Sequence, residues 1–167
     1  MIRFLSRFKL YRFFLQTFLP SFSFYSRITS IKRGDVKASL ERGDVILTRS
    51  RFNLTSIFIP GLYSHACVFD GHNVVEMVSS GYRAIDIDDL LTHTDYIQVL
   101  RLKEGLNYFI EQVLSREGAS YDIAFRPDNK NLYCTELVVE SLPFSVEKKM
   151  WMPDDLLELG FERVLKI

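Results

Sequence analysis

Short apolar segments separated by turn residues run through most of the chain, and their periods indicate a mixture of strands and helices. Strands are predicted at 45–49, 82–87, 96–102 and 161–166, and a hairpin at 64–79. Helices are predicted at 88–91 and 104–117, from Cys134 to a point before Pro143, and from Pro153 onward. Because most neighbouring strands are joined closely enough to pair antiparallel, with helices at the flank, the pattern predicts an α+β fold.

The segment 64–79 contains the strongest short-range signal, an Asp70-Gly71 pair between two apolar runs. A type I′ turn requires positive φ at both central residues and therefore favours this dipeptide. With these two residues as the loop, His65 stands directly opposite Glu76, with Cβ atoms about 5 Å apart. A carboxylate there can hold the imidazole in one tautomer and stabilise its protonated form.

Cys134 is predicted to open a helix. A thiol at a helix N-terminus lies beside unpaired N–H groups and the positive end of the helix dipole, which lower its pKa and favour the thiolate. We therefore interpret Cys134 as a nucleophile, His65 as a base and Glu76 as an orienting carboxylate. The backbone N–H of Cys134 would then hold the oxyanion of a tetrahedral intermediate.

The same residues have other interpretations. A strand histidine can be purely structural, and a free cysteine can be a small core side chain, whereas an unpaired Glu76 among apolar neighbours would be costly. Further alternatives are a Cys67–Cys134 disulfide and a zinc site from His65, Cys67, Glu76 and Cys134. No CxxC or HExxH spacing supports a metal, so no metal or cofactor is expected. Asp44, after a glycine and before a strand, is interpreted as a turn residue.

Charge is distributed unevenly, although 21 basic and 21 acidic residues balance over the 167-residue chain. Seven basic residues and no acidic residue precede Asp35, so the rest of the chain is acidic. That acidic part has no basic stripe, which argues against nucleic acid as a partner. A hydrophobic content of 47% excludes disorder and suits one domain with a sizeable core, placed at 34–167.

The basic segment 1–33 forms a separate N-terminal arm in this interpretation. Aromatic and apolar residues recur at helical spacing along one side of it: Phe4, Phe8, Tyr11, Leu15, Phe18 and Leu19. No stretch reaches the ~20 charge-free apolar residues of a spanning helix. We expect residues 1–30 to contact an anionic membrane surface, with a signal-like segment or a helix packed on the domain as alternatives. The expected location is the cell envelope, membrane-associated or periplasmic, and the alternative is the cytoplasm.

Five segments resemble, in order and spacing, the circularly permuted YiiX/YebB-like branch of the NlpC-type cysteine peptidase superfamily: Gly43–Leu47, Tyr63–Ala66, Val75–Met77, Gly118–Asp122 and Tyr133–Val138. The resemblance covers roughly residues 41–160. It implies a papain-like α+β fold, an antiparallel sheet with flanking helices. It also implies Cys134 as nucleophile, His65 as base and Glu76 as the third polar group, with Tyr121 lining the oxyanion and substrate-binding site.

The function expected from these residues is a thiol hydrolase that cleaves an amide bond through a thioester intermediate, with cell-wall peptide as the implied substrate class. One alternative uses the same three residues on lipid acyl esters or amides, as a hydrolase or acyltransferase. Lecithin:retinol acyltransferase-like proteins are similar in motif order but have a second histidine where this chain has Glu76. The other alternative is a binding module without catalysis.

Overall fold

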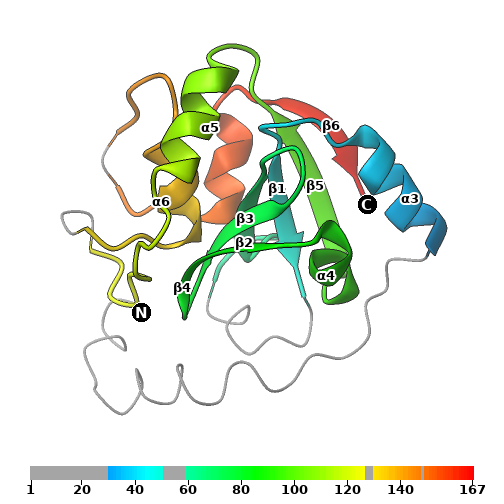
Figure 1. Cartoon of the computed structure of the whole chain (residues 1–167), viewed down its shortest axis with the longest axis horizontal. Helices are drawn as coiled ribbons and strands as arrows, with labels where there is room; N and C mark the ends of the chain where they lie inside the picture. The colour runs from blue at the N-terminus through cyan, green and yellow to red at the C-terminus, as the bar shows by residue number, and fades with distance from the viewer. Residues whose placement is uncertain (1–29, 51–58, 127–129, 148) are drawn as a thin grey trace.

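A computed structural model describes residues 30–50, 59–126, 130–147 and 149–167 (Figure 1). Its centre is a six-stranded antiparallel sheet in the order β4-β3-β2-β1-β5-β6. The strands are β1 (Val45–Arg49), β2 (His65–Phe69), β3 (Val74–Val78), β4 (Gly81–Ile85), β5 (Tyr96–Arg101) and β6 (Glu162–Lys166). The helices are α3 (Ser30–Ser39), α4 (Ile87–Thr92), α5 (Leu106–Leu114), α6 (Cys134–Val139) and the 3₁₀ helix η2 (Pro153–Glu158). The predicted α+β fold is confirmed.

Both faces of the sheet are buried, which explains why its central strands are apolar almost throughout. Alternate residues of a strand point to opposite faces, so Val45 and Leu47 of β1 enter the larger core and Ile46 enters the smaller one. Helices α5 and α6 lie on the side of the larger core, and α3 and α4 lie on the other side (Figure 1). Helix α6 packs against β2 and β3, so the Cys134 helix lies on the predicted hairpin.

The β2–β3 hairpin forms where predicted, but its register differs by two residues. Cys67, and not His65, is the residue directly opposite Glu76. Because side chains alternate with a period of two, a shift of two residues leaves each side chain on the same face. His65 and Glu76 are therefore diagonal neighbours, a separation that long side chains can bridge.

The turn of this hairpin explains the shift. The carboxylate of Asp70 accepts the backbone N–H groups of His72 and Asn73 at 2.8 and 2.7 Å, and the N–H of Asp70 donates to the carbonyl of Asn73 at 2.9 Å. Asp70 thus belongs to the last pair before the loop, and the loop is Gly71-His72 instead of Asp70-Gly71. Gly71 supplies the required positive φ, +106°.

Helix α3 is a structural feature that the sequence pattern did not predict. Gly34, a poor helix former, lies inside it, and Val36 is the one buried side chain among residues 32–39, whose burial the structure describes. The sequence therefore shows no apolar stripe from which to infer a helix. Polar contacts with α4 hold it in place. Lys37 forms an ion pair with Asp88, and the Arg33 guanidinium donates to Leu91 O at 3.4 Å.

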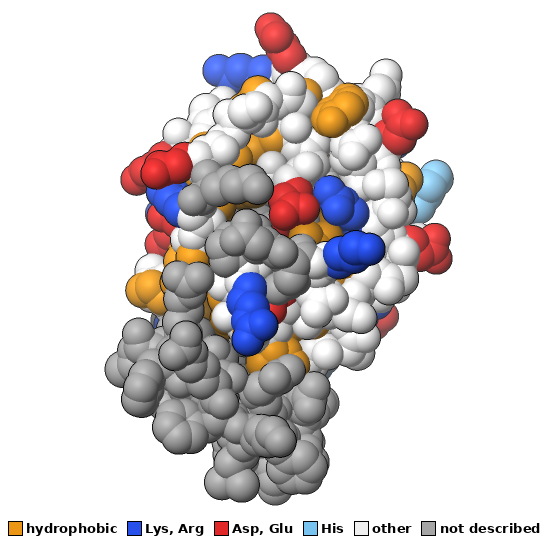
Figure 2. All heavy atoms as spheres, turned by 90° about the vertical axis from the view of Figure 1, so that its left-hand side faces the viewer, with side chains coloured by type: hydrophobic (Ala, Val, Ile, Leu, Met, Phe, Trp, Pro, Cys, Tyr) orange, Lys and Arg blue, Asp and Glu red, His pale blue; other side chains and the backbone are white. Residues whose placement is uncertain are grey.

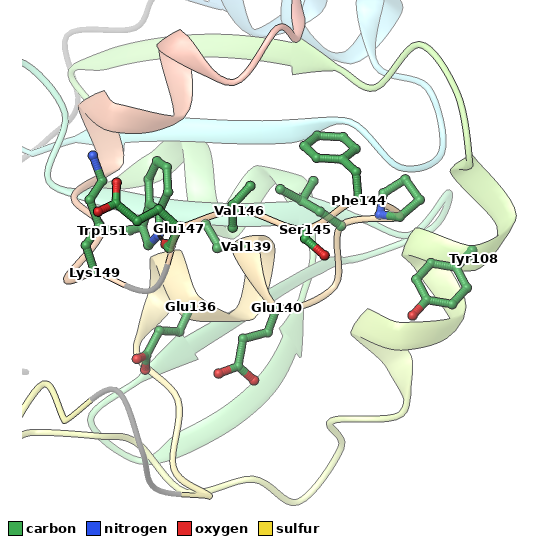
Figure 3. Close-up of a pocket in the computed structure, with 12 residues that line it drawn as sticks. Tyr108, Glu136, Val139, Glu140, Phe144, Ser145, Val146, Glu147, Lys149 and Trp151 are labelled. Carbon is green, nitrogen blue, oxygen red and sulfur yellow. Dashed lines mark hydrogen bonds between the residues drawn. The ribbon is translucent and has the colours of Figure 1, made fainter.

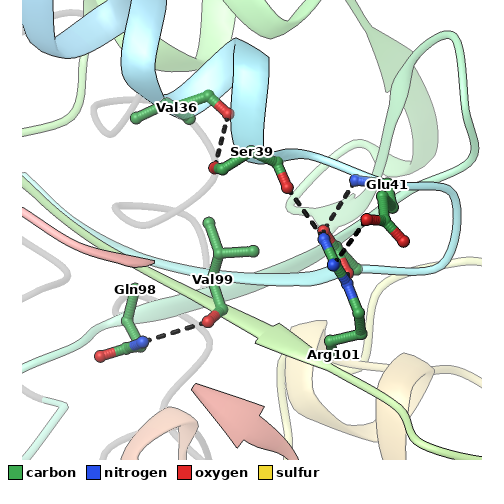
Figure 4. A network of polar contacts seen from close by, with 7 residues as sticks. Val36, Ser39, Glu41, Gln98, Val99 and Arg101 are labelled. Carbon is green, nitrogen blue, oxygen red and sulfur yellow. Dashed lines mark hydrogen bonds and ion pairs between the residues drawn. The ribbon is translucent and has the colours of Figure 1, made fainter. Parts of the chain in front are cut away.

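Asp44 organises the connection from α3 to β1, in agreement with its interpretation as a turn residue. The side chain is fully buried and receives two hydrogen bonds of 2.8 Å from the Arg101 guanidinium and one of 2.8 Å from the Glu41 N–H. Arg101 also donates to Ser39 O and to the Glu41 carboxylate (Figure 4). This network joins the end of α3 to β5.

The predicted N-terminal arm lies largely outside the described residues, which begin at residue 30. The predicted boundary between residues 33 and 34 falls inside α3. Among the described helices, none is long and apolar enough to cross a membrane. The face at the left of Figure 1 carries acidic and basic side chains near one another, with hydrophobic side chains exposed between them (Figure 2).

Candidate active site

Cys134 is the first residue of α6 and is 4% exposed. The preceding Tyr133 has an extended backbone, and its N–H donates to the carboxylate of Glu136 at 3.2 Å, so the side chain three residues ahead closes the first turn. Packing of α6 on β2 brings the thiol beside His65, the first residue of β2, close enough for each to shift the pKa of the other.

His65 connects the thiol to Glu76. Its Nε2 lies 2.5 Å from Oε2 of Glu76, and because an ionised carboxylate only accepts, Nε2 carries the proton in this contact. Nδ1 is therefore the ring nitrogen left to face Cys134. The structure brings the three predicted residues together in the order Cys134, His65, Glu76, although the hairpin register differs from the prediction.

The charges of Cys134 and His65 support each other. Burial raises the pKa of the Cys134 thiol, but the hydrogen bond to His65, the imidazolium charge and the N–H of Ala66 outweigh burial and lower it overall. Burial lowers the pKa of His65, but hydrogen bonds to Cys134 and Glu76 and their negative charges raise it to about 10. Both pKa shifts thus favour a thiolate–imidazolium pair over a neutral thiol and imidazole.

Arg83 is a site residue that the sequence analysis missed. It stands opposite Glu76 across the β3–β4 ladder, and its Nε and Nη2 lie 2.8 and 2.6 Å from Oε1 of Glu76. Burial raises the pKa of Glu76, but His65 and then Arg83 lower it to about 2, so the carboxylate is ionised. The Ser79-Ser80 turn between two predicted strands was the available signal, since a two-residue loop there pairs residue 76 with residue 83.

Cys67 has a different environment from Cys134. It is fully buried in the smaller core, its thiol donates to Ile46 O at 3.4 Å, and burial raises its pKa well above the usual range for cysteine. Both cysteines are free thiols, so no Cys67–Cys134 disulfide is present. Among the described residues, no group of three or more histidine, cysteine or acidic side chains is arranged to hold a metal ion.

Tyr121 lies on a segment that runs beside the start of α6. It forms a bridge with Leu132, and N–H groups on both sides of this bridge donate across it, Asp122 to Leu132 O at 2.9 Å and Leu132 to Ser120 O at 3.0 Å. Burial and the negative charge of Cys134 raise the pKa of Tyr121 well above its usual range. The phenol of Tyr121 therefore keeps its proton and can act as a hydrogen-bond donor.

A cavity of about 370 Å³ follows the outer side of α6 but is separate from this constellation. Glu136 and Glu140 of α6 face it, with Tyr108 of α5 at one end and Trp151 at the other (Figure 3). The described residues that line the cavity do not include Cys134, His65 or Glu76. The proposed chemistry and this cavity therefore belong to different parts of α6.

Two comparisons with known proteins gave matches. A family model described as "permuted papain-like amidase enzyme, YaeF/YiiX, C92 family" matches residues 39–155. The crystal structure of the metalloprotein yiiX from Escherichia coli O157:H7 is similar, with 21% sequence identity and a TM-score of 0.48. The similarity covers 62% of this chain and 64% of that one, so the chain spans less than two thirds of the length of this relative. The comparison with curated proteins gave no match.

Proposed function

The chain belongs to the permuted papain-like amidase family that includes YaeF and YiiX, and from this premise we propose that Cys134, His65 and Glu76 are its catalytic residues. Membership makes the protein an enzyme of the cysteine peptidase or amidase type with a permuted papain-like fold. The observation that carries the proposal is the contact between the Cys134 thiol and an imidazole whose Nε2 lies 2.5 Å from a buried carboxylate.

In the first half of the proposed reaction, His65 holds the thiol proton and the Cys134 thiolate attacks the carbonyl carbon of an amide. The carbonyl oxygen becomes an oxyanion, which the Cys134 N–H and the Tyr121 phenol stabilise by hydrogen bonds. The C–N bond then breaks as the leaving nitrogen takes the proton from His65. An amine departs, and the acyl group remains on Cys134 as a thioester.

In the second half, neutral His65 takes a proton from a water molecule that attacks the thioester carbon. Collapse of the second tetrahedral intermediate expels the Cys134 thiolate and releases a carboxylic acid. Glu76 stabilises the imidazolium that forms in both halves and keeps the ring in one orientation. The starting thiolate–imidazolium pair is thereby restored.

Thiol reactivity tests the assignment without knowledge of the substrate. Iodoacetamide near neutral pH should alkylate Cys134 and leave Cys67 unlabelled, because burial keeps Cys67 as a thiol. Cys67→Ala is the matched control and should keep both labelling and turnover, whereas Cys134→Ala should lose both with the fold intact. Preferential labelling of Cys67, or turnover by Cys134→Ala, would reverse the assignment.

Substitutions of His65 and Glu76 should lower kcat/KM by different amounts, which distinguishes the roles of the two residues. His65→Ala removes the base and should lower kcat/KM by about 10²–10⁴-fold. Glu76→Gln should cost less, because an amide can still orient the ring but cannot stabilise its charge. Equal losses in the two variants, with both proteins folded, would contradict the role given to Glu76.

We further propose peptide amides, including those of cell-wall peptides, as the substrate class. Support comes from the carboxylate at position 76, where the lipid-acyl-transferring relatives named above have a histidine. A panel of peptidoglycan peptide fragments and phospholipids separates the possibilities. Turnover of peptides supports the proposal, and turnover of phospholipids alone would assign the same residues to lipid acyl chemistry. Binding without turnover, together with an unreactive Cys134, would indicate a non-catalytic module.

A further inference from the structure

The carboxylate of Glu76 divides its two oxygens between two partners. Oε2 lies 2.5 Å from Nε2 of His65, and Oε1 lies 2.8 Å from Nε and 2.6 Å from Nη2 of Arg83. The Glu76 side chain is only 3% exposed, whereas half of the Arg83 side chain reaches solvent. Water therefore has little access to Oε1. The hydrogen bonds to this oxygen come from the guanidinium of Arg83 instead.

We propose that Arg83 is a positioning residue, which fixes the orientation and charge of Glu76 and through it supports the Cys134–His65 ion pair. This inference rests on the function proposed above for those three residues. Arg83 does not touch the reacting atoms. It acts on a glutamate side chain that has three rotatable bonds and would otherwise be held at one oxygen by His65.

The charges around Glu76 make this role specific. The titratable and charged groups that face it are His65 of β2 and Arg83 of β4, with Cys67 opposite it on β2 and the Cys134 thiol of α6 beyond His65. Among the described residues, Arg83 is the permanent cation in this group, since the charges of the others depend on pH. Without it, Oε1 would be a buried, charged oxygen with no partner, a costly state that protonation or rotation relieves.

The backbone of β4 holds Arg83 in place from two sides. Gly81 begins the strand with φ of +105°, and a Cβ there would lie 2.8 Å from Ala119 O, so only glycine fits this close approach. The N–H of Tyr82 donates to the same oxygen at 3.0 Å. The start of β4 is thus attached to the segment that carries Tyr121, and Arg83 is aligned with Glu76 by the β3–β4 ladder.

The test is the pH dependence of iodoacetamide alkylation at Cys134 in the full-length protein, which requires no substrate. In Arg83→Gln, the loss of the cation and the freer Glu76 both disfavour the thiolate. The acid limb of the alkylation profile, where Cys134 loses its proton, should therefore move to higher pH by about one unit. Arg83→Lys keeps the charge but not the planar fork and should move it by less. Arg116→Gln, which breaks the surface pair with Glu140 (3.3 Å), is the matched control and should leave the limb in place.

Each outcome decides the proposal. A purely structural role for Arg83 would lower the amount of active protein at every pH without moving the limb, and that result overturns the inference. If Arg83→Gln does not fold, as judged by circular dichroism, Arg83→Lys decides: a shifted acid limb supports the role of Arg83 and an unshifted one rejects it.

His65→Ala in the same assay distinguishes failure of the proposed function from failure of the role proposed for Arg83. A wild-type profile in His65→Ala refutes the proposed function, whereas a disrupted one beside a wild-type profile in Arg83→Gln refutes only the role of Arg83.

Discussion

Glu136 places a carboxyl group inside the protein where its charge is poorly compensated. It is 7% exposed and accepts the Tyr133 N–H at 3.2 Å. Burial raises its pKa, the Tyr133 N–H lowers it, and the charges of Asp122, Glu140 and Cys134 raise it further, to about 8. We expect Glu136→Gln to stabilise the protein at alkaline pH, because an amide keeps an acceptor for Tyr133 and carries no charge.

The sign follows from proton binding. The ordinary pKa of 4.5 applies to the unfolded chain, so between pH 4.5 and about 8 the folded protein binds a proton that the unfolded chain has released. The free energy of unfolding therefore falls as the pH rises through this window. The stability that comes from neutral Glu136 is fully present below pH 4.5 and is lost above about pH 8. Glu136→Gln does not titrate and escapes this loss.

The distance between the two pKa values sets an upper bound of about 5 kcal/mol on the effect. Local relaxation and water entry around the ionised carboxylate reduce it, and we expect about 2 kcal/mol at pH 9. For a chain of this size, that corresponds to a melting temperature about 4–8 °C higher than wild type. Near pH 4.5 the two proteins should melt at nearly the same temperature.

Thermal unfolding followed by circular dichroism at pH 4.5, 7 and 9 checks this prediction. Glu111→Gln, on the exposed side of α5, is the matched control and should change the melting temperature little at any pH. A Glu136→Gln protein that is less stable than wild type at pH 9 would show that the carboxylate is ionised and well paired. A difference independent of pH would likewise refute the reasoning, since it would exclude titration as the cause.

Two other regions give predictions of their own. Asp44→Ala should lower the free energy of unfolding by about 3 kcal/mol, because the part-buried Arg101 guanidinium loses its buried carboxylate partner and keeps only the exposed carboxylate of Glu41. A melting temperature unchanged within 2 °C in thermal unfolding would contradict this. Intact protein should sediment with anionic but not neutral vesicles at low salt. Joint substitution of Arg3, Arg7 and Arg12 by glutamate should abolish sedimentation, since each basic residue near such a surface contributes about 1 kcal/mol to binding. Failure of the intact protein to sediment with anionic vesicles would refute the membrane contact proposed for the arm.

Most of the individual strands and helices could be predicted from the sequence, because each depends on a pattern among neighbouring residues. The strand predicted at 96–102 is β5, Tyr96–Arg101, and the helix predicted at 104–117 is α5, Leu106–Leu114. Helix α3 lacks such a pattern, since contacts with α4 and the buried Val36 side chain stabilise it. The place of β1 in the sheet, between β2 and β5, likewise follows from pairing with a strand far along the chain.

For the site, the sequence by itself determined which side chains carry the chemistry and that His65 and Glu76 share a face, because alternation along a strand survives a shift of two residues. Tertiary structure decided the rest. The Asp70 turn set the register, the β3–β4 ladder brought Arg83 to Glu76, and the packing of α6 on β2 brought Cys134 to His65. Periodicity is a property of adjacent residues, whereas these contacts depend on burial and hydrogen bonding between segments that meet only in the folded chain.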